Sequence, residues 1–296
     1  MMKRNNFPFS AVLGLNHAKT AILIVLVNPR AGGLLISGPR GIGKSTLMRS
    51  TQELIERPWR DIPVSVTEDR LFGTIDTEKA IYSGQKKLYP GIINEADQGV
   101  LYLDDANLLR EDLLDSILNI AEVGAYQLER DGLSLRCDTS FTVIAAINPE
   151  SGMLSGACLD QFGLFVNVDN IHDENTRVEI LKRTISFEKD CASFCNLWKL
   201  ENEKIKKAIY SAMSLLPKVV VSSAMIQLAS VYALKAHVSG HRADIYLIEA
   251  ARALAALAER RYVLPRIWKK RRNSYFPPYE KELGEELPQS DELKIG

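Results

Sequence analysis

The sequence has few cysteines, no excess of either charge and no long apolar run. Four cysteines in 296 residues, with no C-x-x-C pair among them, exclude a disulfide scaffold and argue against a zinc site. Basic and acidic residues number 37 each, so charge gives no reason to expect nucleic acid or an anionic membrane as a partner. The longest apolar stretch, residues 21–27, is far shorter than the ~18–20 residues that cross a bilayer. We therefore expect a cytoplasmic protein without a signal peptide.

Apolar residues make up 46% of the chain, which is enough for a core. In the first 187 residues, short apolar segments alternate with helical patterns. The strand-like segments are residues 33–37, 100–103, 141–147 and 165–168, and the helical ones are residues 18–27 and 43–57. Short buried strands separated by helices predict an α/β fold with a parallel sheet covered on both faces.

The segment after the first predicted strand matches G-x-x-x-x-G-K-[ST], the pattern of a P-loop. Glycines let backbone N–H groups turn toward phosphate oxygens, and the following helix directs the positive end of its dipole at them. Lys44 would reach the β- and γ-phosphates, and the Ser45 hydroxyl would ligate Mg²⁺. The residues expected to bind ATP are Gly38, Pro39, Arg40, Gly41, Ile42, Gly43, Lys44, Ser45 and Thr46.

Polar side chains also follow the next two predicted strands. Asp104 ends residues 100–103, where a P-loop NTPase needs a carboxylate to hold Mg²⁺ through water. Asp105 takes the position of the carboxylate that polarises the attacking water, but it is one methylene shorter than Glu, and a misplacement of ~1 Å can cost ~100-fold in rate. Asn148 ends the third strand, where its amide would bind the γ-phosphate or orient the water. Turn chemistry before Pro149 is the alternative explanation.

Two segments interrupt the alternation of strands and helices. Residues 60–98 are long and contain three glycines and two prolines. Residues 126–136 contain Asp131-Gly132 between two alternating segments, which is typical of a hairpin. Their placement indicates insertions in a P-loop core that spans residues 1–187.

The remainder of the chain reads as helical, and we predict a small helical domain over residues 188–264. Its helical patterns, with no strand between them, are residues 203–216, 223–237 and 243–262. Arg242 opens the last of them, where a cation opposes the helix dipole, so an anionic partner is plausible and Arg242 is our candidate for a γ-phosphate contact. Residues 265–296 form an expected tail, whose basic cluster at 269–272 is more often a solvated helix end than a binding patch.

Together these motifs resemble the AAA+ ATPases, and specifically the I subunit of magnesium chelatase, from about residue 8 to 262. The similar segments are residues 12–50, 71–91, 99–109, 129–136 and 240–257. The resemblance implies a five-stranded parallel sheet between helices, a helical lid, and an ATP-hydrolysing ring, usually a hexamer. It further implies a larger D-like partner with an integrin-like or von Willebrand-type domain, and insertion of Mg²⁺ into a porphyrin by the whole complex.

The resemblance also assigns roles by motif position. Lys44 and Ser45 correspond to Walker A, and Asp104 and Asp105 to Walker B. Asn148 corresponds to sensor 1 and Arg242 to sensor 2, and the chain around residues 13–15 would line the adenine.

Two positions depart from the family pattern. Asp105 replaces a glutamate, and Gln161 stands where the family has its arginine finger, a group worth ~10³–10⁵ in rate in related phosphoryl transfer. A homomeric ring would bind ATP but hydrolyse it poorly, unless a partner or Arg130, Arg136 or Arg177 substitutes for the finger.

Three functions stay open on the sequence. The chain is an ATPase motor of a chelatase-like complex, a nucleotide-binding scaffold whose ATP state controls assembly, or a MoxR-type chaperone-like ATPase that acts on a von Willebrand-type partner. A nucleic-acid motor is disfavoured because the 126–136 hairpin has mixed charge rather than the basic face that phosphates require.

Overall fold

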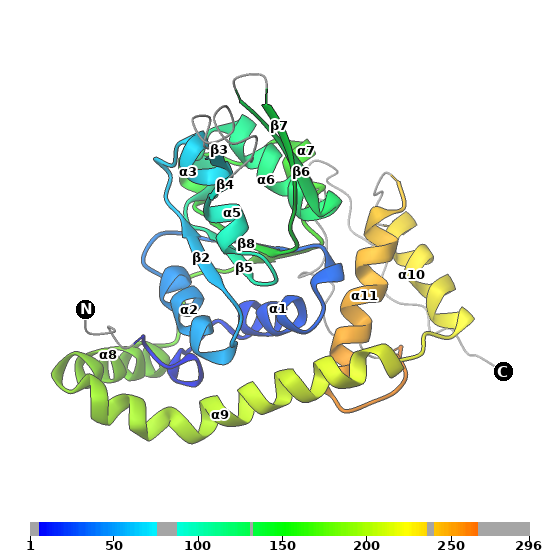
Figure 1. Ribbon diagram of the computed structural model, residues 1–296. Coiled ribbons are helices and arrows are strands. Elements are labelled where there is room, and N and C mark those ends of the chain that lie inside the picture. The colour runs from blue at the N-terminus through cyan, green and yellow to red at the C-terminus, as the bar shows by residue number, and fades with distance from the viewer. Residues whose placement is uncertain (1–5, 76–87, 131–132, 236–239, 266–296) are drawn as a thin grey trace.

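The computed structural model describes residues 6–75, 88–130, 133–235 and 240–265 (Figure 1). At its centre lies a five-stranded sheet with the order β2-β5-β8-β1-β9, and all four strand pairs are parallel. The strands are β1 (Leu34–Ser37), β2 (Trp59–Ile62), β5 (Val100–Leu103), β8 (Thr142–Ile147) and β9 (Leu164–Asn167). The predicted α/β class with a five-stranded parallel sheet is therefore confirmed.

Alternating side chains of the strands point into two separate hydrophobic clusters, one on each face of the sheet. Leu34 and Ile36 of β1 join a cluster that includes α1 (Asn16–Val27) and α2 (Lys44–Thr51). Leu35 joins the other cluster, which α6 (Glu111–Val123) supplies from the opposite face. Because both faces are covered, β1, β5 and β8 are buried along their whole length, as their continuous apolar sequences predict.

The edge strand β2 corrects the predicted extent of the first insertion. It pairs with β5 over residues that the sequence interpretation placed inside the 60–98 insertion, so the insertion begins after Ile62. Arg60 and Asp61 are exposed, and this charged pair in an edge position hides the strand from an apolar pattern. Beyond β2 lie α3 (Glu68–Phe72), a small β3–β4 pair (Gly73–Ile75 and Leu88–Pro90) and α5 (Ile92–Glu95). Residues 76–87 lie outside the described part.

The second predicted insertion is a hairpin that projects from the body of the protein (Figure 1). Its strands are β6 (Ala125–Arg130) and β7 (Leu133–Asp138), which pair in antiparallel register from Ala125↔Asp138 to Arg130↔Leu133. The hairpin is thus confirmed, and its Asp131-Gly132 turn lies outside the described residues.

Four helices follow the sheet: α8 (Glu174–Lys189), α9 (Cys191–Leu215), α10 (Ser223–Lys235) and α11 (Arg242–Leu257). The first was not predicted, and the proposed boundary at residue 187 falls within its last turn. Helix α9 begins earlier than the predicted 203, and α11 ends before the predicted 262. Likewise, the helix predicted over 43–57 ends at Thr51 and continues as a short 3₁₀ turn.

In the described part, none of the helices is long and apolar enough to cross a membrane. The basic cluster at 269–272 and the remainder of the tail lie outside the described residues.

Candidate functional site

The P-loop connects the carboxyl end of β1 to the first turn of α2. Gly43 has a φ of +92°, a conformation that a side chain would strain, and α2 begins at the next residue. The ammonium of Lys44 donates to the carbonyl of Gly38 at 2.5 Å and to that of Pro39 at 2.8 Å. Lys44 therefore closes the loop on itself and is 8% exposed.

Burial lowers the pKa of Lys44, while the neighbouring carboxylates of Asp105 and Asp104 raise it and oppose that effect. The predicted P-loop lysine and both predicted Walker B aspartates therefore lie close enough for their charges to interact. A desolvated ammonium at a helix N-terminus favours an anionic ligand over water.

Asp104 receives two hydrogen bonds on one oxygen. Ser45 Oγ lies 3.2 Å from Asp104 Oδ1, and the Tyr102 hydroxyl donates to the same oxygen at 2.8 Å. Burial and the Asp104 charge raise the pKa of Tyr102, so its hydroxyl stays a donor. A hydroxyl and a carboxylate side by side are the hard oxygen ligands that suit Mg²⁺. Tyr102 was not predicted to belong to the site. The sequence feature that could have indicated it is its hydroxyl, the one polar side-chain group in the apolar strand β5.

Asp105 lies just beyond the strand in a left-handed backbone conformation, with φ 50° and ψ 50°. Aspartate is one of the few residues other than glycine that adopt this region, because its short polar side chain can hydrogen-bond locally. The chain then turns into a 3₁₀ segment, Ala106–Leu108. This conformation sets the direction in which the short Asp105 carboxylate leaves the strand.

Asn148 follows β8 and is 2% exposed. Its Oδ1 accepts from the Glu150 amide at 3.2 Å, and its Nδ2 lies 3.3 Å from Ser151 Oγ. The turn before Pro149, which was the alternative explanation for an asparagine at 148, therefore exists in the structure. Asn148 still lies beside the P-loop strand β1, because β8 pairs with β1. The Gly38 amide donates to the Ile147 carbonyl, one residue before it, at 3.2 Å.

Asn107 connects this turn to the segment after β5. Its Nδ2 donates to the carbonyls of Asn148 at 3.1 Å and Gly152 at 2.9 Å, while its buried Oδ1 has no hydrogen-bond partner among the described residues. The side chain therefore ties the predicted sensor 1 to the predicted Walker B segment. Sequence reasoning missed it, since an asparagine in a turn carries no distinguishing pattern.

A cavity of about 600 Å³ adjoins the P-loop. It lies between the P-loop residues Gly41–Gly43, the chain that precedes α1, the loop after β9 and helix α8. The lining residues used below are Ala11, Val12, Leu13, Ile171, Arg177 and Arg183. Its volume is within the range of small-ligand sites. The expected adenine-lining residues Leu13 and Leu15 face this cavity, whereas the contribution of α8 was not predicted.

Arg242 is not among the residues that the structure brings to the P-loop. Its Nη2 donates to Glu122 Oε1 of α6 at 2.6 Å. One turn along α11, the Tyr246 ring lies 2.5 Å from where a side chain on Gly32 would begin, just before β1. Arg242 therefore lies near the side of the sheet at which the parallel strands begin, which we call the amino edge. The length of β1 separates this side from the P-loop by roughly 13 Å, at ~3.3 Å per residue. Figure 1 shows α11 and α2 well apart.

Gln161 lies at the same amino edge, since it precedes β9 by three residues. Of the arginines considered as substitutes for a finger, Arg136 pairs with Asp138 on the hairpin at 3.0 Å, and Arg177 lines the P-loop cavity of its own chain. The side chain of Arg130 lies outside the described part.

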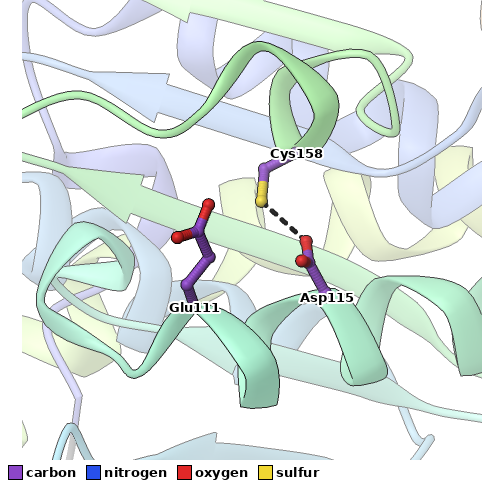
Figure 2. A group of neighbouring side chains, drawn as sticks. All are labelled: Glu111, Asp115 and Cys158. Atoms are coloured by element: carbon purple, nitrogen blue, oxygen red, sulfur yellow. Dashed lines mark hydrogen bonds between the residues drawn. The ribbon is translucent and has the colours of Figure 1, made fainter.

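A group of three possible metal ligands includes Cys158, which precedes Gln161 by three residues. Glu111 and Asp115, one turn apart on α6, face Cys158 of α7 (Gly156–Leu159), and their ligand atoms lie within 4.8 Å of one another (Figure 2). Burial, together with the hydrogen bond to Asp115, raises the pKa of the Cys158 thiol to about 11. The Cys158 thiol donates to the Asp115 carboxylate at 2.9 Å, so we interpret this group as a contact that holds α7 against α6.

Comparison with protein families agrees with this architecture. Residues 33–161 match the AAA domain of the dynein-related subfamily, and residues 227–266 match an AAA lid domain.

Individual relatives extend the likeness over most of the chain. A magnesium-chelatase subunit ChlI homolog from Methanocaldococcus jannaschii is 33% identical over 89% of this chain and 82% of that protein. The magnesium-chelatase 38 kDa subunit of Rhodobacter capsulatus is 34% identical over 85% of this chain and 81% of that protein. Among solved structures, a model of the BchI–BchD complex of magnesium chelatase contains a chain that matches with a TM-score of 0.54 and 29% identity, over 90% of this chain and 99% of that one.

Proposed function

Since the chain belongs to the family of magnesium-chelatase I subunits, we propose that it is the ATPase subunit of a chelatase-like complex. It couples ATP turnover to remodelling of a larger D-like subunit, and the complex inserts a metal into a tetrapyrrole. The observation that carries this proposal is the convergence of the P-loop, the Ser45–Asp104 pair and Asn148 at the carboxyl ends of three neighbouring strands, β1, β5 and β8.

The P-loop binds the triphosphate in this proposal. The backbone N–H groups of residues 40–46 surround the phosphate oxygens, and Lys44 exchanges its two carbonyl partners for the β- and γ-phosphates. Ser45 and Asp104 hold Mg²⁺, which neutralises charge on the phosphates when bound. The Tyr102 hydroxyl keeps one oxygen of Asp104 occupied and so fixes the direction of the other.

Asp105 and Asn148 are the two side chains that position the attacking water. Asp105 accepts its proton or orients it, and the Asn148 amide contacts the γ-phosphate or the same water. The bonds from Asn107 to the Asn148 turn keep these two groups at a fixed separation, which matters because errors of ~1 Å cost ~100-fold in rate.

The amino edge of the sheet serves a neighbouring subunit. Arg242 and Gln161 lie on the far side of the sheet from their own P-loop, so a nucleotide that they reach belongs to the next copy in a ring. A hexamer is the expected ring from the family resemblance. The D-like partner is supported by the solved structure of the BchI–BchD complex of magnesium chelatase.

A nucleotide-binding scaffold with slow hydrolysis is the second candidate function. Two side chains favour it: the neutral Gln161 at the finger position and the short Asp105 at the position of the catalytic carboxylate. The relatives described above are chelatase subunits, which favours either of these functions over a MoxR-type chaperone.

Replacing the P-loop lysine tests the proposed site. Calorimetry with Mg²⁺ and a non-hydrolysable ATP analogue should show binding to the wild type. Lys44→Ala should weaken it about 100-fold, because two charge-assisted hydrogen bonds are lost. Lys182→Ala, an exposed lysine on α8, is the matched control and should bind as the wild type does. Absence of binding to the wild type, or equal binding by Lys44→Ala, would overturn the assignment.

Co-purification from the native host tests the partner. A larger subunit that combines an AAA+ domain with a von Willebrand-type domain should be recovered with this chain in the presence of ATP. Recovery of a von Willebrand-type partner without an AAA+ domain in its place would contradict the chelatase assignment.

A further inference from the structure

Two cations from different helices bind consecutive carbonyls of the segment that lines the P-loop cavity. Lys19 Nζ of α1 donates to the Val12 carbonyl at 2.5 Å, and Arg183 Nη1 of α8 donates to the Ala11 carbonyl at 2.9 Å. We call residues 11–13 the base-side wall, since all three line the cavity next to Gly41–Gly43 of the P-loop. If the P-loop takes the phosphates, the base and sugar extend into this cavity and against this wall.

Arg183 is rigidly held by its own neighbours. Its Nε donates to Glu179 one turn back on α8 at 2.8 Å, and its guanidinium lies 4.5 Å from the centre of the Trp198 ring on α9. Its side chain is 18% exposed. Ionic, stacking and carbonyl contacts together leave it one conformation, so α8 and the base-side wall are fixed relative to each other.

Within the part of the chain that the structure describes, Lys19 makes no ion pair like the one between Arg183 and Glu179. Its ammonium lies 5.3 Å from the centre of the Phe9 ring. Burial and, secondly, the charge of Arg183 lower the pKa of Lys19 to about 8. Charged residues that line the adjacent cavity are Asp169, Arg177, Arg183 and Glu188, and His17 is an exposed neighbour on α1. A desolvated cation beside a second cation is unfavourable for the fold alone.

The geometry points to Lys19 and Arg183 as a pair of positioning residues that set the base-side wall for the bound nucleotide. This inference rests on the proposed function, because it assigns the cavity to a nucleotide. The pair acts through the carbonyls of residues 11 and 12, since Lys19 itself does not line the cavity. The pair holds the wall at two consecutive carbonyls from two different helices, so the loss of either bond lets the wall shift.

The same pair makes nucleotide affinity depend on pH. A polyanion bound in the adjacent cavity favours the charged form of Lys19, so binding raises the pKa of Lys19 above its free value. A group whose pKa rises on binding takes up a proton, and affinity then falls as pH rises through the free value of about 8. One such group changes affinity by at most about tenfold per pH unit.

Four proteins distinguish a positioning role of Lys19 in nucleotide binding from a purely structural role. They are the wild type, Lys19→Arg, Lys19→Met and Lys182→Met. Each is titrated with MgADP by calorimetry between about pH 7.5 and about pH 9.5, a range that spans the Lys19 titration. The wild type should lose affinity as pH rises. Lys19→Arg should bind as the wild type does at the lower pH and keep that affinity at the higher one, because arginine stays charged. Lys19→Met should bind about tenfold more weakly at the lower pH, with a flat profile. Lys182→Met should match the wild type throughout.

Two results would overturn the inference. One is a Lys19→Arg profile that falls as the wild-type profile does, and the other is binding by Lys19→Met as tight as that by Lys182→Met. Thermal unfolding by circular dichroism establishes that each variant is folded. Absence of MgADP binding to the wild type would instead overturn the proposed function itself.

Discussion

The carboxyl edge of the central sheet, where its parallel strands end, and the amino edge, where they begin, differ in how many functional side chains are already in place. At the carboxyl edge, Lys44, Ser45 and Asp104 are already joined by hydrogen bonds or close charges. At the amino edge, Gln161 is neutral and Arg242 is bonded to Glu122. One edge is organised before a nucleotide arrives, whereas the other offers no unengaged cation among the residues expected to act there.

Under the proposed function, this difference separates binding from hydrolysis. Groups at the carboxyl edge then serve the chain's own nucleotide and give affinity. Groups at the amino edge act, in the proposed ring, on the neighbour's nucleotide and give rate, because charge that matters only in the transition state raises kcat and not affinity. Substitutions at the two edges should therefore move different quantities.

Restoring the finger should produce the largest change. Gln161→Arg places a cation at the amino edge, and steady-state ATPase per ring should rise by roughly 10³-fold, the lower end of what fingers contribute elsewhere. The affinity for MgADP should stay within about twofold, because ADP lacks the phosphoryl group on which the finger acts.

The control for this change is Gln161→Lys, which has the charge without the planar fork and should gain less. Adding Asp105→Glu to Gln161→Arg tests whether the left-handed conformation at 105 suits the longer side chain. A wild type that already turns over ATP as fast as Gln161→Arg would show that the amino edge is complete without an arginine at 161.

The carboxyl edge was predictable because its chemistry is local in sequence. The P-loop is eight consecutive residues, and Asp104 and Asn148 each end an apolar strand. Parallel strands bring their carboxyl ends to one edge, so position along each strand was sufficient to bring these side chains together.

The groups that were missed depend on contacts between distant parts of the chain. Arg183 meets the Ala11 carbonyl across 172 positions in the sequence, and Asn107 meets Asn148 across 41. Helix α8 has no fully buried residue, and its apolar residues Val178, Leu181 and Ile185 are exposed, so a buried apolar face does not fix its place beside the cavity. The orientation of Arg242 likewise depends on how α11 packs, which its own sequence does not encode.

Asn107 offers a test within the carboxyl edge that separates rate from affinity. Asn107→Ala removes both bonds to the Asn148 turn, so the water-orienting groups lose their fixed separation and kcat should fall about tenfold. The affinity for the ATP analogue should change less than about threefold, since the P-loop is untouched. Asn119→Ala, an exposed asparagine on α6, is the matched control. An equal loss in kcat and affinity would show that Asn107 supports the P-loop rather than the sensor turn.

The smallest effect is expected from releasing Arg242. Glu122→Gln removes the charge from a pair whose side chains are 42% and 46% exposed, and pairs of this kind contribute only about 0–1 kcal/mol. An unpaired Arg242 is freer to meet the neighbour's phosphate, so ATPase activity of the assembled ring should rise up to about fivefold. The gain should shrink at high salt, because an exposed cation is screened there.

Glu201→Gln, an exposed glutamate on α9, controls for the change in net charge. Dilution supplies the sharper comparison, since a residue that acts on a neighbour has no effect in a monomer. If Glu122→Gln raised nucleotide affinity in the monomer as much as activity in the ring, Arg242 would serve its own P-loop. The division of labour between the two edges would then be wrong, because both edges would act on one nucleotide.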